Sequence, residues 1–316
     1  MRLKATFSSA HLPSDSVFLA CSSHEDRCLG IVEKWGRWRP REAVVFHYDD
    51  PNPRREHNHP MLQDTLSTAC EVKEIPFTEA DAVSSFHAQR EKLRMVADES
   101  ACRPLVVDIS VMTKRHLLML LRWLDDHDCW NRLWVVYTEP EEYEIEGHLP
   151  LSFGISCVEQ VPGFSASPDP SRPLHTAMFL GYEGDRAFAT YELLQAKQTT
   201  LVVPHPPFRE SWVGRTETQN RDLLALVGDS AVLKADSLDP ESSLAVLRNV
   251  FGPTTERAEF SRAICPLGTK PQVLGAYMYL RQAIDPPAVI YTGSLRHNHS
   301  YYSRGVGPSW LIHRPV

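Results

Sequence analysis

The sequence predicts an α/β protein of two tandem Rossmann-like domains, each with a doubly wound and mainly parallel sheet, that together form a pseudo-dimer. Three observations lead to this fold class: an internal duplication, a regular alternation of apolar and amphipathic runs, and a stretch rich in Gly, Ser and Pro between the halves. They place a first domain at 1–162, a linker at 163–175 and a second domain at 176–316.

The duplication is seen when the two halves are read against each other. Asp26-Arg27 matches Asp185-Arg186 at a spacing of 159 residues. The other matches, in the same order, are the apolar run before His47 with that before His205, Asn58 with Asn220, Thr113-Lys114 with Thr269-Lys270, Tyr137-Thr138 with Tyr291-Thr292, and Pro150-Leu151-Ser152-Phe153 with Pro308-Ser309-Trp310. Each pair is common by itself, but six in register indicate a duplicated domain.

Short runs rich in β-branched residues alternate with amphipathic runs in both halves, which is typical of βαβ units on a parallel sheet. The first half reads strand Val17–Cys21, helix Asp26–Trp35, strand Ala43–Tyr48, helix Met61–Ala69, strand Glu71–Ile75, helix Glu79–Val96, strand Leu105–Ile109, helix Thr113–Asp126 and strand Leu133–Thr138. The second reads strand Ala177–Gly181, helix Gly184–Gln195, strand Thr200–Pro204, helix Gln219–Leu226, strand Ala231–Ala235, helix Pro240–Val250, strand Ala263–Pro266, helix Pro271–Ala283 and strand Ala288–Thr292. Between the halves, Gly163–Pro173 has almost no large apolar residue and is typical of an exposed linker.

Composition excludes several classes of protein. The net charge of −7 argues against binding to extended nucleic acid, which needs a basic surface. No apolar run reaches the ~18 residues that span a bilayer, and no secretion signal is present, so we expect no membrane partner. The seven cysteines are scattered without a CxxC pair, which favours a reduced, cytoplasmic chain without a metal site.

Ligands of doubly wound sheets bind beyond the carboxyl ends of the strands, where the strand order reverses. In the common order, this switch point lies between the first and fourth strands. The loops expected there are Ser22–Arg27 and Ser110–Lys114 in the first half, and Tyr182–Arg186 and Leu267–Lys270 in the second. These loops also carry the duplicated polar residues, which makes them the candidate site.

The duplicated pairs Thr113-Lys114 and Thr269-Lys270 each come where a strand ends and a helix begins. The free N–H groups of a helix start favour an anion, and a hydroxyl and an ammonium strengthen that preference. Gly268 would let the backbone approach such a ligand closely. Alternatively, each Thr is only a helix cap and each Lys a solvated side chain. No P-loop pattern is present, so nucleotide hydrolysis of that type is not expected.

Arginines and an acid flank the same loops. Arg27 and Arg186 could reach a phosphate across the switch point, or could instead fix a helix start through an ion pair. Asp108, next to Ser110 and Lys114, ends a central strand, where such enzymes often place a catalytic group. A structural role for Asp108, capping the following loop, is the alternative. The second half has no equivalent acid, so an active site would be asymmetric.

Aromatic and amide side chains follow the last strand of each half. Tyr137, Tyr291 and Asn298 could stack on a base and read it, or could belong to a polar loop at the rim of the domain. No GxGxxG fingerprint opens the first helix, so we expect no nicotinamide or flavin cofactor.

The motif Leu267-Gly268-Thr269-Lys270 resembles the Gly-Thr-Lys-type motif of the CRISPR-associated Rossmann fold (CARF) sensor domains, and Val111-Met112-Thr113-Lys114 resembles it with the glycine replaced. Tandem fusions of such units include the related SAVED sensors. The resemblance implies a sensor that binds a nucleotide or cyclic oligonucleotide in a cleft between the duplicated domains. It also implies an effector protein partner and a role in a prokaryotic anti-phage or CRISPR-type defence pathway.

Two other functions are compatible with the sequence. One is a phosphodiesterase or other nucleotide-processing enzyme with Asp108, Ser110 and Lys114 as the catalytic set. The other is a scaffold whose paired domains bind another protein. Whether the chain is an enzyme therefore stays open at this stage.

Overall fold

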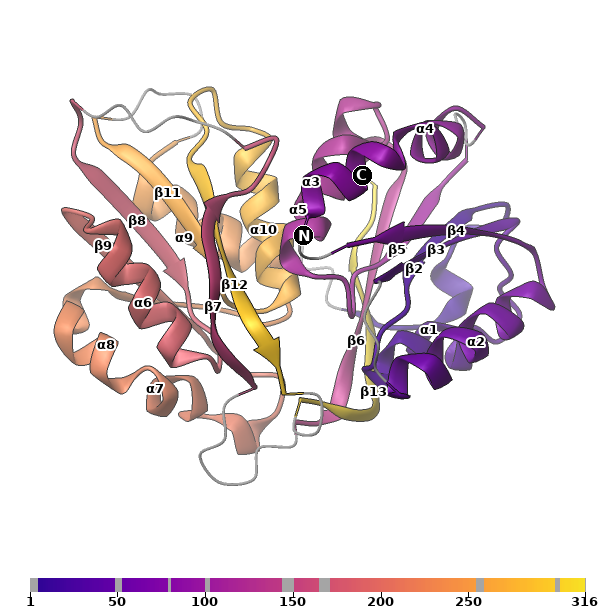
Figure 1. The fold of residues 1–316 in the computed structure, drawn as a ribbon, viewed down its shortest axis with the longest axis horizontal. Coiled ribbons are helices and arrows are strands. Elements are labelled where there is room, and N and C mark those ends of the chain that lie inside the picture. Colours follow the sequence, from indigo (N-terminus) through magenta and orange to yellow (C-terminus); the bar gives the residue numbers. More distant parts are fainter. Residues whose placement is uncertain are drawn as a thin grey trace. The chain divides into compact units, whose positions relative to one another are not determined.

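The computed structural model describes residues 5–48, 53–78, 81–99, 103–143, 151–164, 171–253, 259–298 and 302–315. The chain divides into two compact units, each an α/β domain (Figure 1). Unit 1 consists of Leu3–Glu146 and His299–Val316, and unit 2 of Gly147–Asn298. The predicted fold class, two tandem Rossmann-like domains, is confirmed.

Unit 1 contains a seven-stranded sheet in the order β1-β13-β6-β5-β2-β3-β4. Its strands are β1 Ala5–Thr6, β2 Val17–Cys21, β3 Glu42–Tyr48, β4 Glu71–Phe77, β5 Leu105–Asp108, β6 Leu133–Glu142 and β13 Arg304–His313. Its helices are α1 Gly30–Lys34, α2 Pro53–Ser67, α3 Ala82–Ala88, α4 Arg90–Glu99 and α5 Lys114–Asp126, with 3-10 turns at Ser9–His11, Asp26–Leu29 and Trp130–Arg132. Strands β2 to β6 are parallel, whereas β13 is antiparallel to β6 and β1 is antiparallel to β13.

Unit 2 contains a six-stranded sheet in the order β10-β9-β8-β11-β12-β7. Its strands are β7 Ser152–Gln160, β8 Leu174–Phe179, β9 Gln198–Pro204, β10 Val232–Ala235, β11 Ser261–Pro266 and β12 Ala288–His297. Its helices are α6 Gly184–Leu194, α7 Arg215–Gln219, α8 Arg221–Val227, α9 Pro240–Phe251 and α10 Lys270–Leu280, with 3-10 turns at Glu210–Trp212 and Asp229–Ala231. Strands β8 to β12 are parallel, and β7 is antiparallel to β12.

The five parallel strands of each unit follow the same order, with the first strand between the second and the fourth. The switch point therefore lies between β2 and β5 in unit 1 and between β8 and β11 in unit 2. The central strands are buried along their whole length, as in β2 and β11, because helices cover both faces of a doubly wound sheet. All ten parallel strands were predicted from their apolar runs.

The predicted domain boundaries are wrong. Strand β7 lies within the proposed first domain, 1–162, but pairs with β12 of unit 2. Strand β13 lies within the proposed second domain, 176–316, but pairs with β6 of unit 1. Each half of the chain thus supplies the antiparallel strand of the other unit. The predicted linker 163–175 joins β7 to β8 inside unit 2, and its residues 165–170 lie outside the described part of the chain.

Strands β7 and β13 occupy equivalent places, each antiparallel to the fifth parallel strand of a unit. The expected match of Ser152-Phe153 with Ser309-Trp310 is out of register, because Tyr291 pairs with Glu159 whereas its duplicate Tyr137 pairs with Trp310. No local pattern therefore indicates which unit each of these strands joins. Within the described residues, no helix is long and apolar enough to cross a bilayer.

Candidate functional site

At the switch point of unit 1, the guanidinium of Arg27 is buried and bound on two sides. Arg27 Nη2 lies 2.7 Å from Glu25 Oε2, and Arg27 Nη1 donates to the hydroxyl of Tyr137, at 3.1 Å. Burial lowers the pKa of Arg27, but the Glu25 carboxylate together with Tyr137 and Tyr143 raises it, and the resulting pKa lies well above its ordinary value. With 2% of its surface exposed, Arg27 matches the ion-pair alternative better than the phosphate-binding one.

Arg186 has the same arrangement in unit 2. Its Nη1 lies 2.6 Å from Glu183 Oε2, and its Nη2 donates to the carbonyl of Thr292 in β12. Thr292 Oγ1 is also hydrogen-bonded to Thr190 of α6, at 2.6 Å. Both arginines therefore tie the loop after the first parallel strand to the fifth parallel strand.

Thr113 is the N-cap of α5, as the capping alternative proposed. Its hydroxyl accepts from the backbone N–H of His116 and is 2.8 Å from His116 Nδ1. The Thr113 N–H donates to the hydroxyl of Tyr48, at 3.0 Å. Lys114, the first residue of the helix, is half-buried.

Thr269 caps α10 in the same way. Its hydroxyl accepts from the N–H of Gln272, while the Gln272 side chain accepts from the Thr269 N–H, which forms a capping box. Gly268 permits this arrangement, because a Cβ there would lie 2.3 Å from Gln272 Oε1. Lys270 follows the cap and is half-buried, like Lys114.

Asp108 and Ser110 form a closed network at the end of β5. Asp108 Oδ1 accepts from the N–H of Ser110, at 2.9 Å, and from the Ser110 hydroxyl. The Ser110 hydroxyl in turn accepts from the N–H of Thr138, at 2.7 Å. Both side chains are buried, so the network holds the loop against β6, as the structural alternative for Asp108 proposed.

The residues proposed to read a base lie in different environments. Tyr137 and Tyr291 are buried, and burial holds the pKa of Tyr137 well above its ordinary value. Asn298 is half-exposed, and its backbone N–H donates to the carbonyl of Leu151, at 2.8 Å. Tyr48, not predicted, is the half-buried aromatic side chain that contacts a Thr-Lys motif directly.

Sequence reasoning also missed a polar row that runs from the carboxyl end of β2, through α2, to the middle of β4. Ser22 Oγ lies 2.9 Å from His59 Nδ1, and His59 Nε2 lies 3.0 Å from Glu74 Oε1. The three residue types match a nucleophilic triad, but Ser22 is fully buried and its N–H is bound to the carbonyl of Phe46. The row therefore fixes α2 against the sheet.

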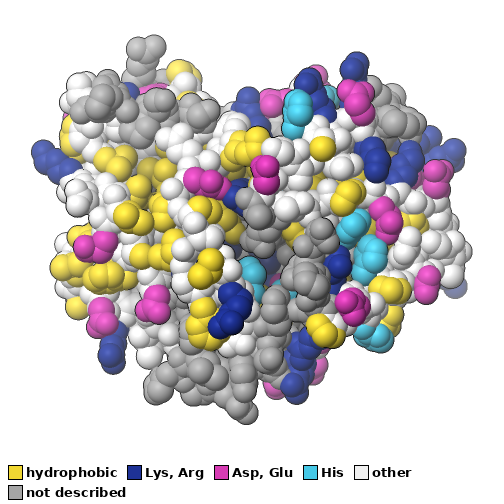
Figure 2. All heavy atoms as spheres, viewed as in Figure 1, with side chains coloured by type: hydrophobic (Ala, Val, Ile, Leu, Met, Phe, Trp, Pro, Cys, Tyr) yellow, Lys and Arg dark blue, Asp and Glu magenta, His cyan; other side chains and the backbone are white. Residues whose placement is uncertain are grey.

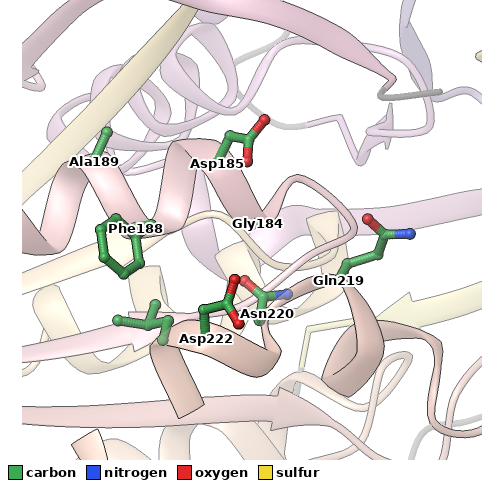
Figure 3. Close-up of a pocket in the computed structure, with 8 residues that line it drawn as sticks. Gly184, Asp185, Phe188, Ala189, Gln219, Asn220 and Asp222 are labelled. Atoms are coloured by element: carbon green, nitrogen blue, oxygen red, sulfur yellow. The ribbon is translucent and has the colours of Figure 1, made fainter. Parts of the chain in front are cut away.

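A groove-like pocket of about 310 Å³ lies in unit 2 between α6 and the α7–α8 segment (Figure 3). It is lined by Gly184, Asp185, Phe188, Ala189, Gln219, Asn220, Asp222 and Leu223. Two duplicated features of the sequence pointed to this region: the match of Asn58 with Asn220, and Asp185 in the candidate loop Tyr182–Arg186. Within the described residues, no cluster of His, Cys, Asp or Glu could hold a metal ion.

Comparison with known proteins does not identify a family. No family model matches the chain, and no curated protein matches it. Among solved structures, the crystal structure of the cytoplasmic domain of a prokaryotic cation chloride cotransporter is 8% identical, with 92% of this chain and 99% of that chain covered. Its TM-score is 0.24, so this similarity supports no conclusion about function.

Proposed function

We propose that each Rossmann-like unit binds the phosphate of a nucleotide or cyclic oligonucleotide at the start of the helix after its fourth parallel strand, and that the chain acts as a nucleotide sensor. One observation carries the proposal. Thr113-Lys114 and Thr269-Lys270 begin equivalent helices, α5 and α10, in two sheets of the same strand order. Helix starts beside a switch point are where such sheets bind anions.

The capping contacts indicate different roles for the Thr and the Lys of each motif. Each Thr hydroxyl accepts from the N–H of the third helical residue, so its role is to fix the first turn. Lys114 and Lys270 then supply the positive charge, together with the N–H groups of the first turn. Pro271 has no N–H, so α10 offers one donor fewer than α5.

In unit 1 the Tyr48 ring is the candidate base-stacking group, because its hydroxyl already touches the α5 cap. Its ring centroid lies 5.2 Å from that of His116. A ligand phosphate at the α5 start would displace the Tyr48 hydroxyl from the Thr113 N–H. In unit 1 we therefore expect Tyr48, and not the buried Tyr137, to stack on the base.

The resemblance to CARF and SAVED sensors makes a cyclic oligoadenylate the first ligand to test, and it suggests an effector protein partner in antiviral defence. The enzyme alternative is less well supported, because the Asp108 and Ser110 oxygens are engaged in the loop network.

Thermal unfolding with nucleotides and cyclic oligonucleotides tests the proposal. A ligand at one hundred times its Kd should stabilise the protein by about 2.7 kcal/mol, a rise in Tm of several degrees. Lys114→Ala and Lys270→Ala should each reduce the shift. The exposed residues Lys92 and Lys197 give matched controls, Lys92→Ala and Lys197→Ala, which should retain it. An equal shift in the Lys114→Ala/Lys270→Ala double variant, or no shift with any ligand, would contradict the proposal.

A further inference from the structure

The pocket between α6 and α8 contains a buried hydrogen-bond acceptor that has no partner within the described residues. Asn220 is 2% exposed, and its Oδ1 accepts no hydrogen bond there. The orientation of this amide is fixed, because Nδ2 donates to the carbonyls of Gly181 and Thr216, both at 2.8 Å. Rotating the amide by half a turn would place its oxygen against those two carbonyls. Buried acceptors are nearly always satisfied, so this oxygen indicates a missing donor.

Two carboxylates line the same pocket. Asp185 lies in the first turn of α6 and Asp222 in the first turn of α8. Figure 3 shows the Asn220 oxygen directed toward the Asp222 side chain. Negative charge near a helix start is stabilising, so the presence of the two acids can be explained without a ligand. The unpaired Asn220 Oδ1 has no such structural explanation, and it is therefore the atom that indicates a ligand.

The pocket therefore presents these acceptors, together with the Gln219 amide, beside an aromatic ring. Phe188 is 38% exposed, and Figure 2 shows mainly hydrophobic and acidic side chains over α6 and α8. The neighbouring Arg221 lies 3.4 Å from Asp222, but both side chains are about 80% exposed, so this ion pair is weak and can be displaced.

Unit 1 shows what the equivalent acid accepts. Asp26 is the duplicate of Asp185, and its Oδ2 accepts a backbone N–H from Gly305, at 2.9 Å. Asp26 Oδ1 also lies 3.5 Å from the Nδ2 of Asn58, the duplicate of Asn220. In unit 1 this position is thus built to receive N–H donors.

We propose that the unit 2 pocket binds a guanidinium group, with Asp185, Asp222 and Asn220 Oδ1 accepting its N–H donors and Phe188 stacking on its plane. A guanidinium is planar and cationic, and it has five donors and no acceptor, which matches acceptors and an aromatic face better than an ammonium does. The guanidinium could belong to a small molecule or to an arginine side chain of a partner protein. This site is independent of the anion sites at α5 and α10.

Calorimetric titration of the full chain with arginine amide, lysine amide and citrulline amide tests the inference. Arginine amide should bind saturably, and citrulline amide, whose side chain is uncharged, at least about tenfold more weakly. Asp185→Asn and Asp222→Asn should each weaken binding about tenfold, whereas Asp229→Asn, an exposed acid of the same unit, should not. Phe188→Leu keeps the apolar volume but removes the aromatic face, and it should weaken arginine amide more than lysine amide.

A short arginine-containing peptide distinguishes the sources of the guanidinium. Binding at least about tenfold tighter than arginine amide would indicate a protein partner, and comparable binding a small molecule. Three results would overturn the inference: no saturable binding of arginine amide or the peptide, equal or tighter binding of lysine amide, and unchanged affinity in the Asp185→Asn/Asp222→Asn double variant. Thermal unfolding of each variant without ligand separates loss of binding from loss of folding.

Discussion

Arg27 and Glu25 form an ion pair inside unit 1, with 2.7 Å between Arg27 Nη2 and Glu25 Oε2. The other guanidinium nitrogen binds the Tyr137 hydroxyl, and Glu25 Oε2 accepts from the hydroxyl of Ser303, at 2.6 Å. The pair thereby joins the loop after β2 to β6 and to the residue before β13. It occupies the position where the sequence suggested a phosphate ligand.

Removing the arginine should therefore destabilise the protein. We expect Arg27→Met to lower the free energy of unfolding by about 3–5 kcal/mol, because the buried Glu25 carboxylate loses its counter-charge. The double variant Arg27→Met/Glu25→Gln should recover part of this loss, since the remaining amide is neutral. Urea unfolding of the three proteins measures both effects. A loss below about 1 kcal/mol for Arg27→Met would show that the pair is not structural.

Gly275 lies inside α10, where alanine would normally be favoured by about 1 kcal/mol. Its Cβ would, however, meet the backbone carbonyl oxygen of Pro240 at 2.2 Å and Ser243 Cβ at 2.7 Å. Because that carbonyl belongs to the packed helix α9, we expect Gly275→Ala to destabilise the protein by about 1–3 kcal/mol in urea unfolding.

Gly268→Ala is the matched comparison. The atom nearest to its Cβ is the end of the Gln272 side chain, which can rotate away at the expense of the capping box. Gly268→Ala should therefore lower the free energy of unfolding by only about 1 kcal/mol. A larger loss for Gly268→Ala than for Gly275→Ala would contradict this ranking.

Strand exchange predicts which fragments can fold. A fragment of residues 147–298 contains the whole of unit 2, including β7, and should unfold cooperatively. A fragment of residues 176–316 lacks β7, so the edge of β12 is uncovered, and it carries β13 without its partner β6. It should be less stable or should aggregate. Circular dichroism with urea titration compares the two, and equal stability would argue against the exchange.

Buried thiols should make stability depend on alkaline pH. Burial raises the pKa of the Cys265 thiol to about 12, from about 9 in the unfolded chain. Above pH 9 the unfolded state therefore loses a proton that the folded state keeps, so the free energy of unfolding falls as pH rises toward 12. The slope approaches about 1.4 kcal/mol per pH unit for one thiol.

Cys265→Ala should reduce the slope of the free energy of unfolding against pH between pH 9 and 11. Any loss of packing in this variant lowers the free energy of unfolding equally at every pH and does not change the slope. Cys28, whose pKa burial also raises to about 12, gives the equivalent test in unit 1. Urea unfolding at several pH values measures the difference between each variant and the unchanged protein. Parallel pH profiles would contradict the buried, protonated state of these thiols.

The sequence by itself determined the ten parallel strands, most of the helices and the duplication, because these depend on local apolar patterns and on matches along the chain. It also located the capping threonines, since a hydroxyl before a helix acts within one turn. Tertiary structure alone decided which unit receives β7 and β13, which partners Arg27 and Arg186 bind, and that Asn220 faces a pocket. These outcomes depend on contacts between residues far apart in the chain, and no local apolar pattern or motif brings such residues together before the chain is folded.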